Sequence, residues 1–413
     1  FWLKQPHSLP PHFFCWPPVR LPAGGPEEAL PMSNVSTDYR SDYEESEESE
    51  EEEEDEVEDE LSSVGPPAVP DVVGGRYRVK HEIGSGSYSE VYLGTERGTG
   101  TEVAVKVEWM HAEKGDKLVD EAKLYDDLGK SDAIPRILWS GPAGEYNVMV
   151  MELLGPCIDS IFKKMQKFSL KTTLMLGEQF IDRLEFVHER GVLYRDIKPH
   201  NFLMGTGDNS RRVYIVDFGL AKRYRDPRTG EHMKGSRKHR RGVTGTVRYS
   251  SLNVHKGYDA SRRDDLEATG YMLVHFLRGD LPWLGLKATS KRTKHELIGD
   301  KKMEVSDEEL CRGLPSEFVE YLRYCRSLNF SERPDYDHLR GLFRALAARK
   351  GLELDGAFDW AGGEYDSAPT QERATKRQRK ADGREKNDRQ AISRSGGRAS
   401  GRRSRSPKAG RRM

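Results

Sequence analysis

The sequence has little cysteine and no long apolar run. Only four of its 413 residues are cysteine, and none stands in a CxxC pair: they are Cys15, Cys157, Cys311 and Cys325. This pattern argues against a disulfide or zinc framework and favours a reducing compartment. No apolar segment approaches the roughly 20 residues of a membrane span, and the aromatic, proline-rich start lacks the layout of a signal peptide. Because residue 1 is phenylalanine, the sequence leaves the natural start of the protein open.

The net charge is also close to zero, but the chain contains one strongly acidic segment and one strongly basic segment. The chain has 67 Lys and Arg against 68 Asp and Glu. Fifteen of the twenty residues from Ser41 to Glu60 are acidic, whereas residues 361–413 hold sixteen basic and six acidic residues. Such blocks bury too little apolar area to offset chain entropy. We therefore predict a disordered Pro-rich and acidic arm over residues 1–73 and a disordered basic tail over residues 361–413.

The stretch from Leu193 to Met204 carries the clearest chemistry. Asp196 is followed two residues later by Lys198 and five residues later by Asn201, and a further apolar run ends at Asp217. The spacing is typical of a catalytic loop and a metal-holding turn, the pair that a protein kinase needs for phosphoryl transfer. Asp196 would accept or orient the proton of the incoming hydroxyl, and Lys198 would neutralise the phosphoryl group. Asn201 and Asp217 would hold Mg²⁺ through hard oxygen ligands.

Two features upstream support this interpretation. Glycines between two predicted strands, in Gly84-Ser85-Gly86-Ser87-Tyr88-Ser89-Glu90-Val91, would let backbone N–H groups close over phosphates, although a GxG turn alone is a weak signal. Leu118, Ala122 and Tyr125 share one face of a predicted helix, and Glu121 borders that face. An inward carboxylate needs a cation, for which we predict Lys106 at the end of the strand from Glu102.

The order of elements predicts an α+β fold with two lobes. Alternating strands precede an apolar strand that ends in Gly155-Pro156, and helical periodicity follows, with further helices around residues 262–278, 291–298, 315–327 and 335–349. We predict a protein kinase domain over residues 74–360, divided into an N-lobe (74–151), a hinge (152–156) and a C-lobe (157–360).

Several stretches resemble the casein kinase 1 family of serine/threonine kinases over residues 76–360. They are Met149 to Pro156, Lys198 to Gly205, Ser261 to Glu267, Leu281 to Ala288 and, most tellingly, Ser251-Leu252-Asn253, which stands where other kinases carry Ala-Pro-Glu. The resemblance implies an ATP site with Ile83, Val91 and Ala104 against the adenine, Met151 behind it, Leu203 below it, and the backbones of Glu152 and Leu154 as its hydrogen-bond partners.

The same resemblance implies a preference for acidic or already phosphorylated substrates. One anion site would comprise Arg248, Gly285 and Lys294, and another would comprise Arg195, Lys222 and Arg241. A phosphate with a charge of about −1.5 to −2 calls for such basic residues, although a single basic residue is usually only solvated surface.

The chain departs from the family pattern in four places. Tyr194 replaces the usual His before Arg-Asp, as in some family members, and Ser89 replaces the third loop glycine. Leu284 stands where the family usually has Gln, and Lys234 to Arg241 is more basic than usual, which would favour acidic substrates.

The arms suggest partners for the site. Ser62 and Ser63 lie three residues after Asp59 and Glu60, so the acidic arm is a candidate for autophosphorylation or inhibition, with a merely solubilising tract as the alternative. The basic tail favours nuclear import or weak, non-specific RNA contact, and it contains no cysteine for a lipid anchor.

We predict a monomeric serine/threonine kinase of the cytoplasm and nucleus that uses ATP and Mg²⁺. The alternative is an inactive kinase-fold scaffold that binds partners or RNA through its charged arms. The complete set of Lys106, Glu121, Asp196, Asn201 and Asp217 argues against it, because a scaffold would be free to lose one of them.

Overall fold

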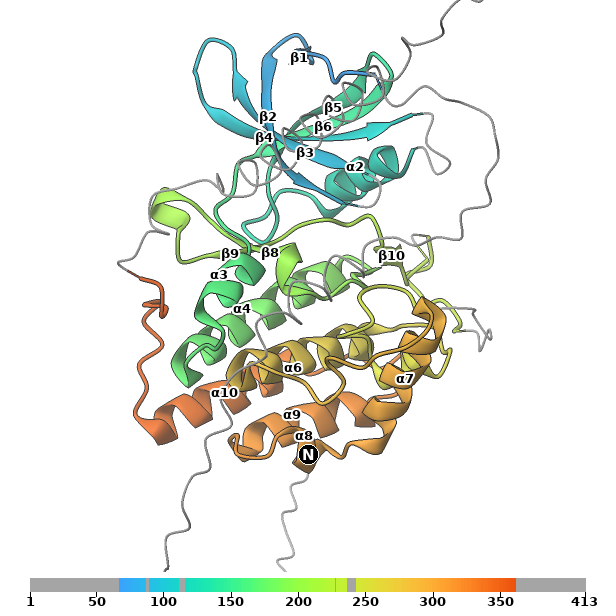
Figure 1. Ribbon diagram of the computed structural model, residues 1–413, viewed down its shortest axis with the longest axis vertical. Coiled ribbons are helices and arrows are strands. Elements are labelled where there is room, and N and C mark those ends of the chain that lie inside the picture. The colour runs from blue at the N-terminus through green and yellow to red at the C-terminus, as the bar shows by residue number, and fades with distance from the viewer. Residues whose placement is uncertain (1–66, 87–88, 111–115, 227, 236–242, 362–413) are drawn as a thin grey trace, which may run out of the picture. The chain divides into compact units, whose positions relative to one another are not determined.

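The computed structural model describes residues 67–86, 89–110, 116–226, 228–235 and 243–361. The N-terminal part of this region holds β1 (Val72–Val73), β2 (Tyr77–Ser85), β3 (Glu90–Glu96), β4 (Glu102–Trp109), α2 (Lys117–Leu128), β5 (Ile137–Ala143) and β6 (Tyr146–Glu152). Its strands form one antiparallel sheet in the order β1-β2-β3-β4-β6-β5, with α2 packed against it (Figure 1).

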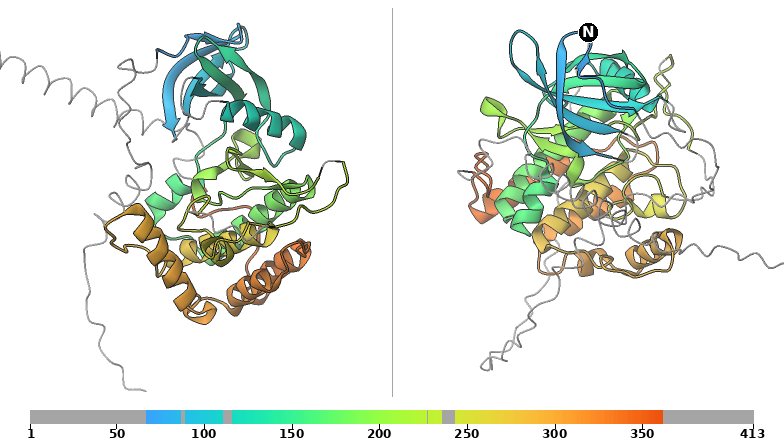
Figure 2. Two further views of the ribbon diagram at one scale, coloured as in Figure 1. Left: turned by 90° about the vertical axis from the view of Figure 1, so that its right-hand side faces the viewer. Right: turned by 45° about the horizontal axis from the view of Figure 1, so that its top comes forward.

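The second part is mainly helical (Figure 2). Its elements are α3 (Ile158–Met165), α4 (Leu170–Glu189), β7 (Val192–Leu193), η1 (Pro199–Asn201), β8 (Phe202–Met204), η2 (Gly207–Asn209), β9 (Val213–Ile215), β10 (Lys222–Arg223), α5 (Leu252–His255), α6 (Arg262–Arg278), α7 (Lys291–Glu304), α8 (Asp307–Leu310), α9 (Ser316–Ser327) and α10 (Tyr336–Lys350). The predicted two-lobed α+β fold is confirmed.

Side-chain alternation along β4 gives the sheet two different faces. Val103, Val105 and Val107 belong to an apolar cluster on one face, whereas Ala104 joins the main core on the other. Because successive side chains of a strand point to opposite sides, Lys106 lies on the same face as Ala104. That face carries α2, whose buried residues include Glu121. The strand period and the helix period thus bring a lysine and a glutamate together.

The sheet begins earlier than the sequence predicted. Val72–Val73 form β1 and pair with Tyr77 and Arg78 of β2, and Val73 is fully buried against the outer face of the sheet. Residues 67–73, which we assigned to the disordered arm, therefore belong to the folded N-lobe. A strand of two residues is too short for its alternation to be recognised in a sequence.

The linker between the lobes lies against β8. Gly155 donates its N–H to the Met204 carbonyl at 2.8 Å, and Met204 donates to the Pro156 carbonyl at 3.0 Å. A Cβ atom on Gly155 would lie 2.9 Å from the carbonyl oxygen of Gly205. Glycine is therefore required here by close backbone approach, and the hinge is held near the catalytic loop that precedes β8.

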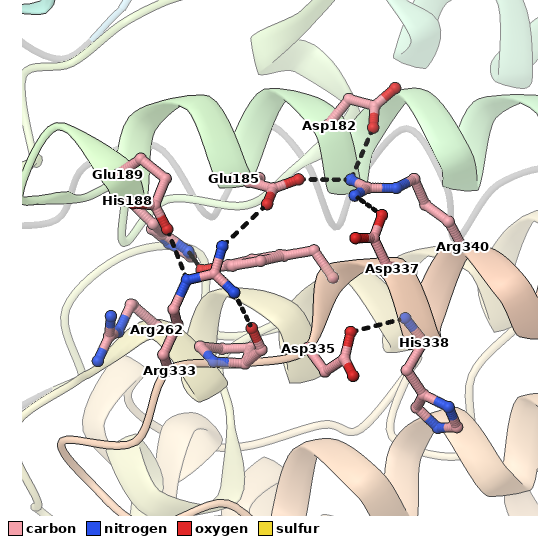
Figure 3. A network of polar contacts seen from close by, with 12 residues as sticks. Asp182, Glu185, His188, Glu189, Arg262, Arg333, Asp335, Asp337, His338 and Arg340 are labelled. Atoms are coloured by element: carbon pink, nitrogen blue, oxygen red, sulfur yellow. Dashed lines mark hydrogen bonds and ion pairs between the residues drawn. The ribbon is translucent and has the colours of Figure 1, made fainter.

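Helices α4 and α6 form the centre of the C-lobe core, and α10 packs on α4. Charged contacts also join α10, and Arg333 just before it, to α4, as Figure 3 shows. The Arg340 guanidinium lies 2.8 Å from Asp182 and 2.6 Å from Glu185, and Arg333 lies 2.9 Å from Glu189. These pairs fix the helix that leads into the catalytic loop.

The predicted helix over residues 291–298 is six residues longer than expected. Helix α7 continues through Gly299 to Glu304. Glycine normally weakens a helix interior, but a Cβ atom at residue 299 would lie 2.8 Å from the Nδ1 atom of His255. Tertiary contact between α7 and α5 therefore explains both the glycine and the added turns.

Candidate active site

The predicted pair of Lys106 and Glu121 is formed in the structure. The Lys106 Nζ atom lies 2.7 Å from Glu121 Oε2 and 3.1 Å from Asp217 Oδ1. Lys106 and Glu121 are both buried. A buried charge is tolerated when it is paired and hydrogen-bonded, so this ammonium ties β4, α2 and the turn after β9 to one point.

Lys106 and Asp217 each favour the charged form of the other. Burial alone would lower the pKa of Lys106, but the Asp217 and Glu121 carboxylates outweigh it and raise that pKa. The ammonium of Lys106 lowers the pKa of Asp217, whereas burial raises the pKa of Glu121. Asp217 is therefore held as a carboxylate, the form that a metal ion requires.

The turn Asp217-Phe218-Gly219 is fixed to α2. Phe218 donates its N–H to Glu121 Oε1 at 3.2 Å, and Asp217 donates its N–H to the Tyr125 hydroxyl at 3.2 Å. The Phe218 ring packs edge-on against Tyr125 and Tyr194, with centroid distances of 4.9 and 5.4 Å. These contacts join the helix, the turn and the catalytic loop in one cluster of aromatic rings.

Tyr194, at the position where the family usually has His, takes part in the same arrangement. Its hydroxyl donates to the Val216 carbonyl at 2.6 Å, and its side chain is fully buried. Burial raises the pKa of this phenol well above its ordinary value. The phenol therefore stays protonated and donates a bond that ties the catalytic loop to the residue before Asp217.

Asp196 is held by three neighbours that aim its carboxylate. Its Oδ1 atom accepts from the backbone N–H and the hydroxyl of Thr246, at 3.0 and 2.9 Å. Its Oδ2 atom accepts from Asn201 Nδ2 at 3.1 Å and lies 3.1 Å from Lys198 Nζ. Because Asn201 uses its amide nitrogen here and at the Asp196 carbonyl, its amide oxygen is the group that could ligate a cation.

The backbone of the catalytic loop is strained and held in place. Arg195 and Asp217 are two of the four non-glycine residues with positive φ in the described part of the chain, at 69° and 64°. Such conformations cost about 1–3 kcal/mol each and persist only where the surroundings enforce them. The Asp265 carboxylate accepts from the N–H groups of Tyr194 and Arg195, at 2.9 and 2.8 Å.

The activation segment, which follows the Asp217 turn in the sequence, contains Gly245. At this glycine it contacts the catalytic loop. A Cβ atom there would lie 2.2 Å from the carbonyl oxygen of Arg195, and Gly245 has φ of 83°. The glycine allows the next residue, Thr246, to reach Asp196. Sequence reasoning missed both Thr246 and Asp265. Asp265 lies within a stretch that carried the family resemblance, whereas no local pattern marks Thr246.

The residues expected around a nucleotide lie on adjacent strands. Val91 pairs with Lys106, Ala104 pairs with Met151, and Leu203 makes a bridge with Cys157 just after the hinge. Ile83, Gly84 and Ser85 end β2, and Gly86 donates its N–H to the Ser89 carbonyl at 2.8 Å. Ser87 and Tyr88 lie outside the described residues. The hinge strand is fixed by Arg136, which binds the Glu152 carboxylate at 2.9 Å.

The two expected anion sites are placed as follows. Arg195 and Lys222 line one small cavity together with Thr244 and Thr246, whereas Arg241 lies outside the described residues. In the other site, the indole N–H of Trp283 binds the Arg248 carbonyl at 2.9 Å, which brings the loop that contains Gly285 to Arg248. Lys294 lies on α7. This helix also carries Lys302, which binds the carbonyls of Val247 and Ser250 on either side of Arg248. The roles of these residues stay predictions.

Comparison with known families agrees with this geometry. The family model of the protein kinase domain matches residues 77–341, well over half of the chain. The chain therefore belongs to the protein kinase family. Domains of this family generally transfer the γ-phosphoryl group of ATP with the help of Mg²⁺, and this fold and site define the protein as a kinase.

Replacing Thr246 by Val removes one of the two bonds that this residue donates to Asp196. A hydrogen bond to a charged group contributes about 1.5–3 kcal/mol, so we expect kcat to fall roughly tenfold or more, with the KM for ATP little changed. Thr246→Ser keeps the hydroxyl and should retain most of the activity. Steady-state kinetics measure both, and equal kcat values for the Val and wild-type proteins would contradict the assigned role.

Proposed function

We propose that the protein is a serine/threonine kinase of the casein kinase 1 type that acts on acidic or pre-phosphorylated proteins. The observation that carries the proposal is the assembly of Lys106, Glu121, Asp196, Asn201 and Asp217 around one site, with the first four buried. A scaffold that only displays charged arms would have no need of this arrangement.

The roles follow from the geometry. The Asp196 carboxylate, aimed by Thr246 and Asn201, would accept or orient the proton of a substrate hydroxyl. Lys198, 3.1 Å from Asp196, would offset negative charge on the transferred phosphoryl group. Mg²⁺ would be held by Asp217 and Asn201, and the nucleotide phosphates by Lys106. Once bound, Mg-ATP supplies the phosphoryl group.

The preference for anionic substrates is supported by the basic residues around the substrate side of the site. Arg195 and Lys222 line a cavity next to Thr246, and Arg248 is mostly buried in the segment that follows. Guanidinium and ammonium groups in such positions suit a phosphate or carboxylate. The resemblance to casein kinase 1 at Ser251-Leu252-Asn253 points the same way.

Phosphate transfer to a peptide with a phosphoserine upstream of the target serine should exceed transfer to the same peptide without it. Asp217→Asn removes a metal-binding charge and should abolish transfer to both. Labelled ATP and the two peptides measure this directly. Equal rates on both peptides would refute the anion preference, and a well-folded wild type with no transfer would favour the scaffold.

We also propose that Ser62 and Ser63 are phosphorylated by a second copy of the chain. Both serines lie outside the described residues, but their attachment point does not. The Pro67 carbonyl accepts a bond from the Tyr146 hydroxyl, and Val69 and Val73 pack on the outer face of the sheet. Lys106 is on the opposite face. Ser63 is four residues from Pro67, a span of at most about 14 Å, so the serines would have to pass around the sheet to reach their own site.

Mixing wild type with a size-tagged Asp217→Asn protein tests this proposal. We expect phosphate on Ser62 and Ser63 of the inactive protein, at a rate per enzyme that rises with protein concentration. Labelling of the wild type alone, at a rate independent of concentration, would show intramolecular transfer. Mass spectrometry that finds neither serine modified would refute the arm as a substrate.

The remaining expectations concern partners and location. No described helix is long and apolar enough to cross a membrane. The basic tail lies outside the described residues, and we propose nuclear import as its role because its lysine and arginine clusters fit that signal. A monomeric state, weak RNA contact and a division between cytoplasm and nucleus stay predictions.

A further inference from the structure

A buried lysine lies beneath the segment that carries Arg248. Lys302 is only 1% exposed, near the end of α7. Its Nζ atom donates to the Val247 carbonyl at 2.8 Å and to the Ser250 carbonyl at 2.7 Å, and it lies 3.2 Å from His255 Nε2. The same atom is 5.0 Å from the ring centroids of both Tyr271 and Trp283.

The groups around Lys302 Nζ suit an ammonium ion. A buried charge is expensive unless hydrogen bonds satisfy it, and here two carbonyls and an imidazole face the three donors of Lys302. The two aromatic faces add cation–π attraction. Burial and the nearby ammonium lower the pKa of His255 to about 3. His255 is therefore neutral at physiological pH and can accept a hydrogen bond.

Other buried side chains hold the residues in between. Trp283 donates its indole N–H to the Arg248 carbonyl at 2.9 Å, and the Tyr249 hydroxyl lies 2.9 Å from His275 Nδ1. Trp283 and Tyr271 pack edge-on at a centroid distance of 5.1 Å. Every residue from Val247 to Ser250 is therefore bound to α6, to α7 or to the loop between them.

The consequence concerns the predicted anion site. Arg248 lies inside the segment that Lys302 and Trp283 hold, Gly285 follows Trp283 by two residues, and Lys294 lies on the same helix as Lys302. Lys302 thus connects the element that carries Lys294 to the segment that carries Arg248. If that connection is lost, both elements can remain folded while the relative position of their basic groups changes.

We propose that Lys302 is a positioning residue that sets the preference for anionic substrates by holding the Val247–Ser250 segment against α7. The proposal rests on the proposed kinase function. It assigns no contact between Lys302 and the substrate, because the ammonium points into the protein interior. Trp283 acts in the same way through a single hydrogen bond.

Lys302→Met tests the proposal, because methionine fills a similar apolar space but donates no hydrogen bond. We expect the ratio of kcat/KM for the primed peptide to that for the unprimed peptide to fall roughly tenfold or more, since small misplacements of binding groups have effects of this size. The KM for ATP should change little. Trp283→Phe, which removes the bond to the Arg248 carbonyl and keeps a smaller aromatic ring beside Lys302, should lower the ratio less and provides a milder variant if Lys302→Met does not fold.

The matched control is Lys301→Met. Lys301 is the preceding residue on α7 and pairs with Glu304 at 3.1 Å, so this variant removes the same charge without touching the Val247–Ser250 segment. Its peptide ratio should equal that of the wild type. A similar fall in Lys301→Met would show a general charge effect and overturn the proposal, as would an equal loss on both peptides in Lys302→Met and Trp283→Phe.

Amide hydrogen exchange separates this proposal from the proposed function. Exchange over residues 244–255 should increase in Lys302→Met but not in Lys301→Met. If the wild type does not prefer the primed peptide, the proposed substrate preference fails and so does the specificity role of Lys302. Unchanged exchange in this segment would overturn its positioning role, whatever the activity.

Discussion

The Lys106 ammonium lies between the carboxylates of Glu121 and Asp217, and this contact joins three elements that are distant in sequence. The lysine comes from β4, the glutamate from α2 and the aspartate from the turn after β9. Because an unpaired charge in this position would be costly, α2 must lie close to the sheet when the cluster is formed. The N-lobe sheet, the helix and the turn that carries Asp217 are thereby placed relative to one another by one buried cation.

A second fixed point lies in the C-lobe. The Asp265 carboxylate binds two N–H groups of the catalytic loop, and His188 Nε2 lies 2.9 Å from the same carboxylate. His188 Nδ1 in turn lies 2.8 Å from the Tyr336 hydroxyl of α10. The catalytic loop is therefore supported by α4, α6 and α10 together. Its strained backbone at Arg195 is maintained by these contacts and not by local preference.

The segment from Thr246 to Ser250 is held by two side chains. Thr246 donates to Asp196, and Lys302 donates to the carbonyls of Val247 and Ser250. The roles proposed for catalysis and for substrate recognition therefore fall on adjacent residues of one segment. In the proposed account, Lys302 influences substrate selection through this segment, without contacting the substrate.

The sequence was sufficient to predict the elements in which apolar residues recur with a clear helical or strand period. The spacing of Leu118, Ala122 and Tyr125 predicted the inward face of α2, and the inward Glu121 predicted Lys106 as its partner. Features that depend on contacts between distant residues could not be predicted in this way. Thr246 is 50 residues from Asp196 and Lys302 is 55 residues from Val247, and neither stands in a pattern that indicates its partner.

The same reason explains the errors at the boundaries. β1 is recognisable only through its pairing with β2, and the last turns of α7 depend on the contact of Gly299 with His255. In both places a tertiary contact overrides a weak or unfavourable local signal. The casein kinase 1 resemblance extended the interpretation to substrate class, which the residue periods alone could not indicate.

The central claim is that Asp217, held ionised by Lys106, is a Mg²⁺ ligand at a nucleotide site. Calorimetric titration of ATP into the wild type and into Asp217→Asn, each with and without Mg²⁺, tests it most directly. Mg²⁺ should strengthen ATP binding to the wild type and have much less effect on the variant, in which Lys106 still has Glu121 as its partner. An equal effect of Mg²⁺ on both proteins would contradict the account.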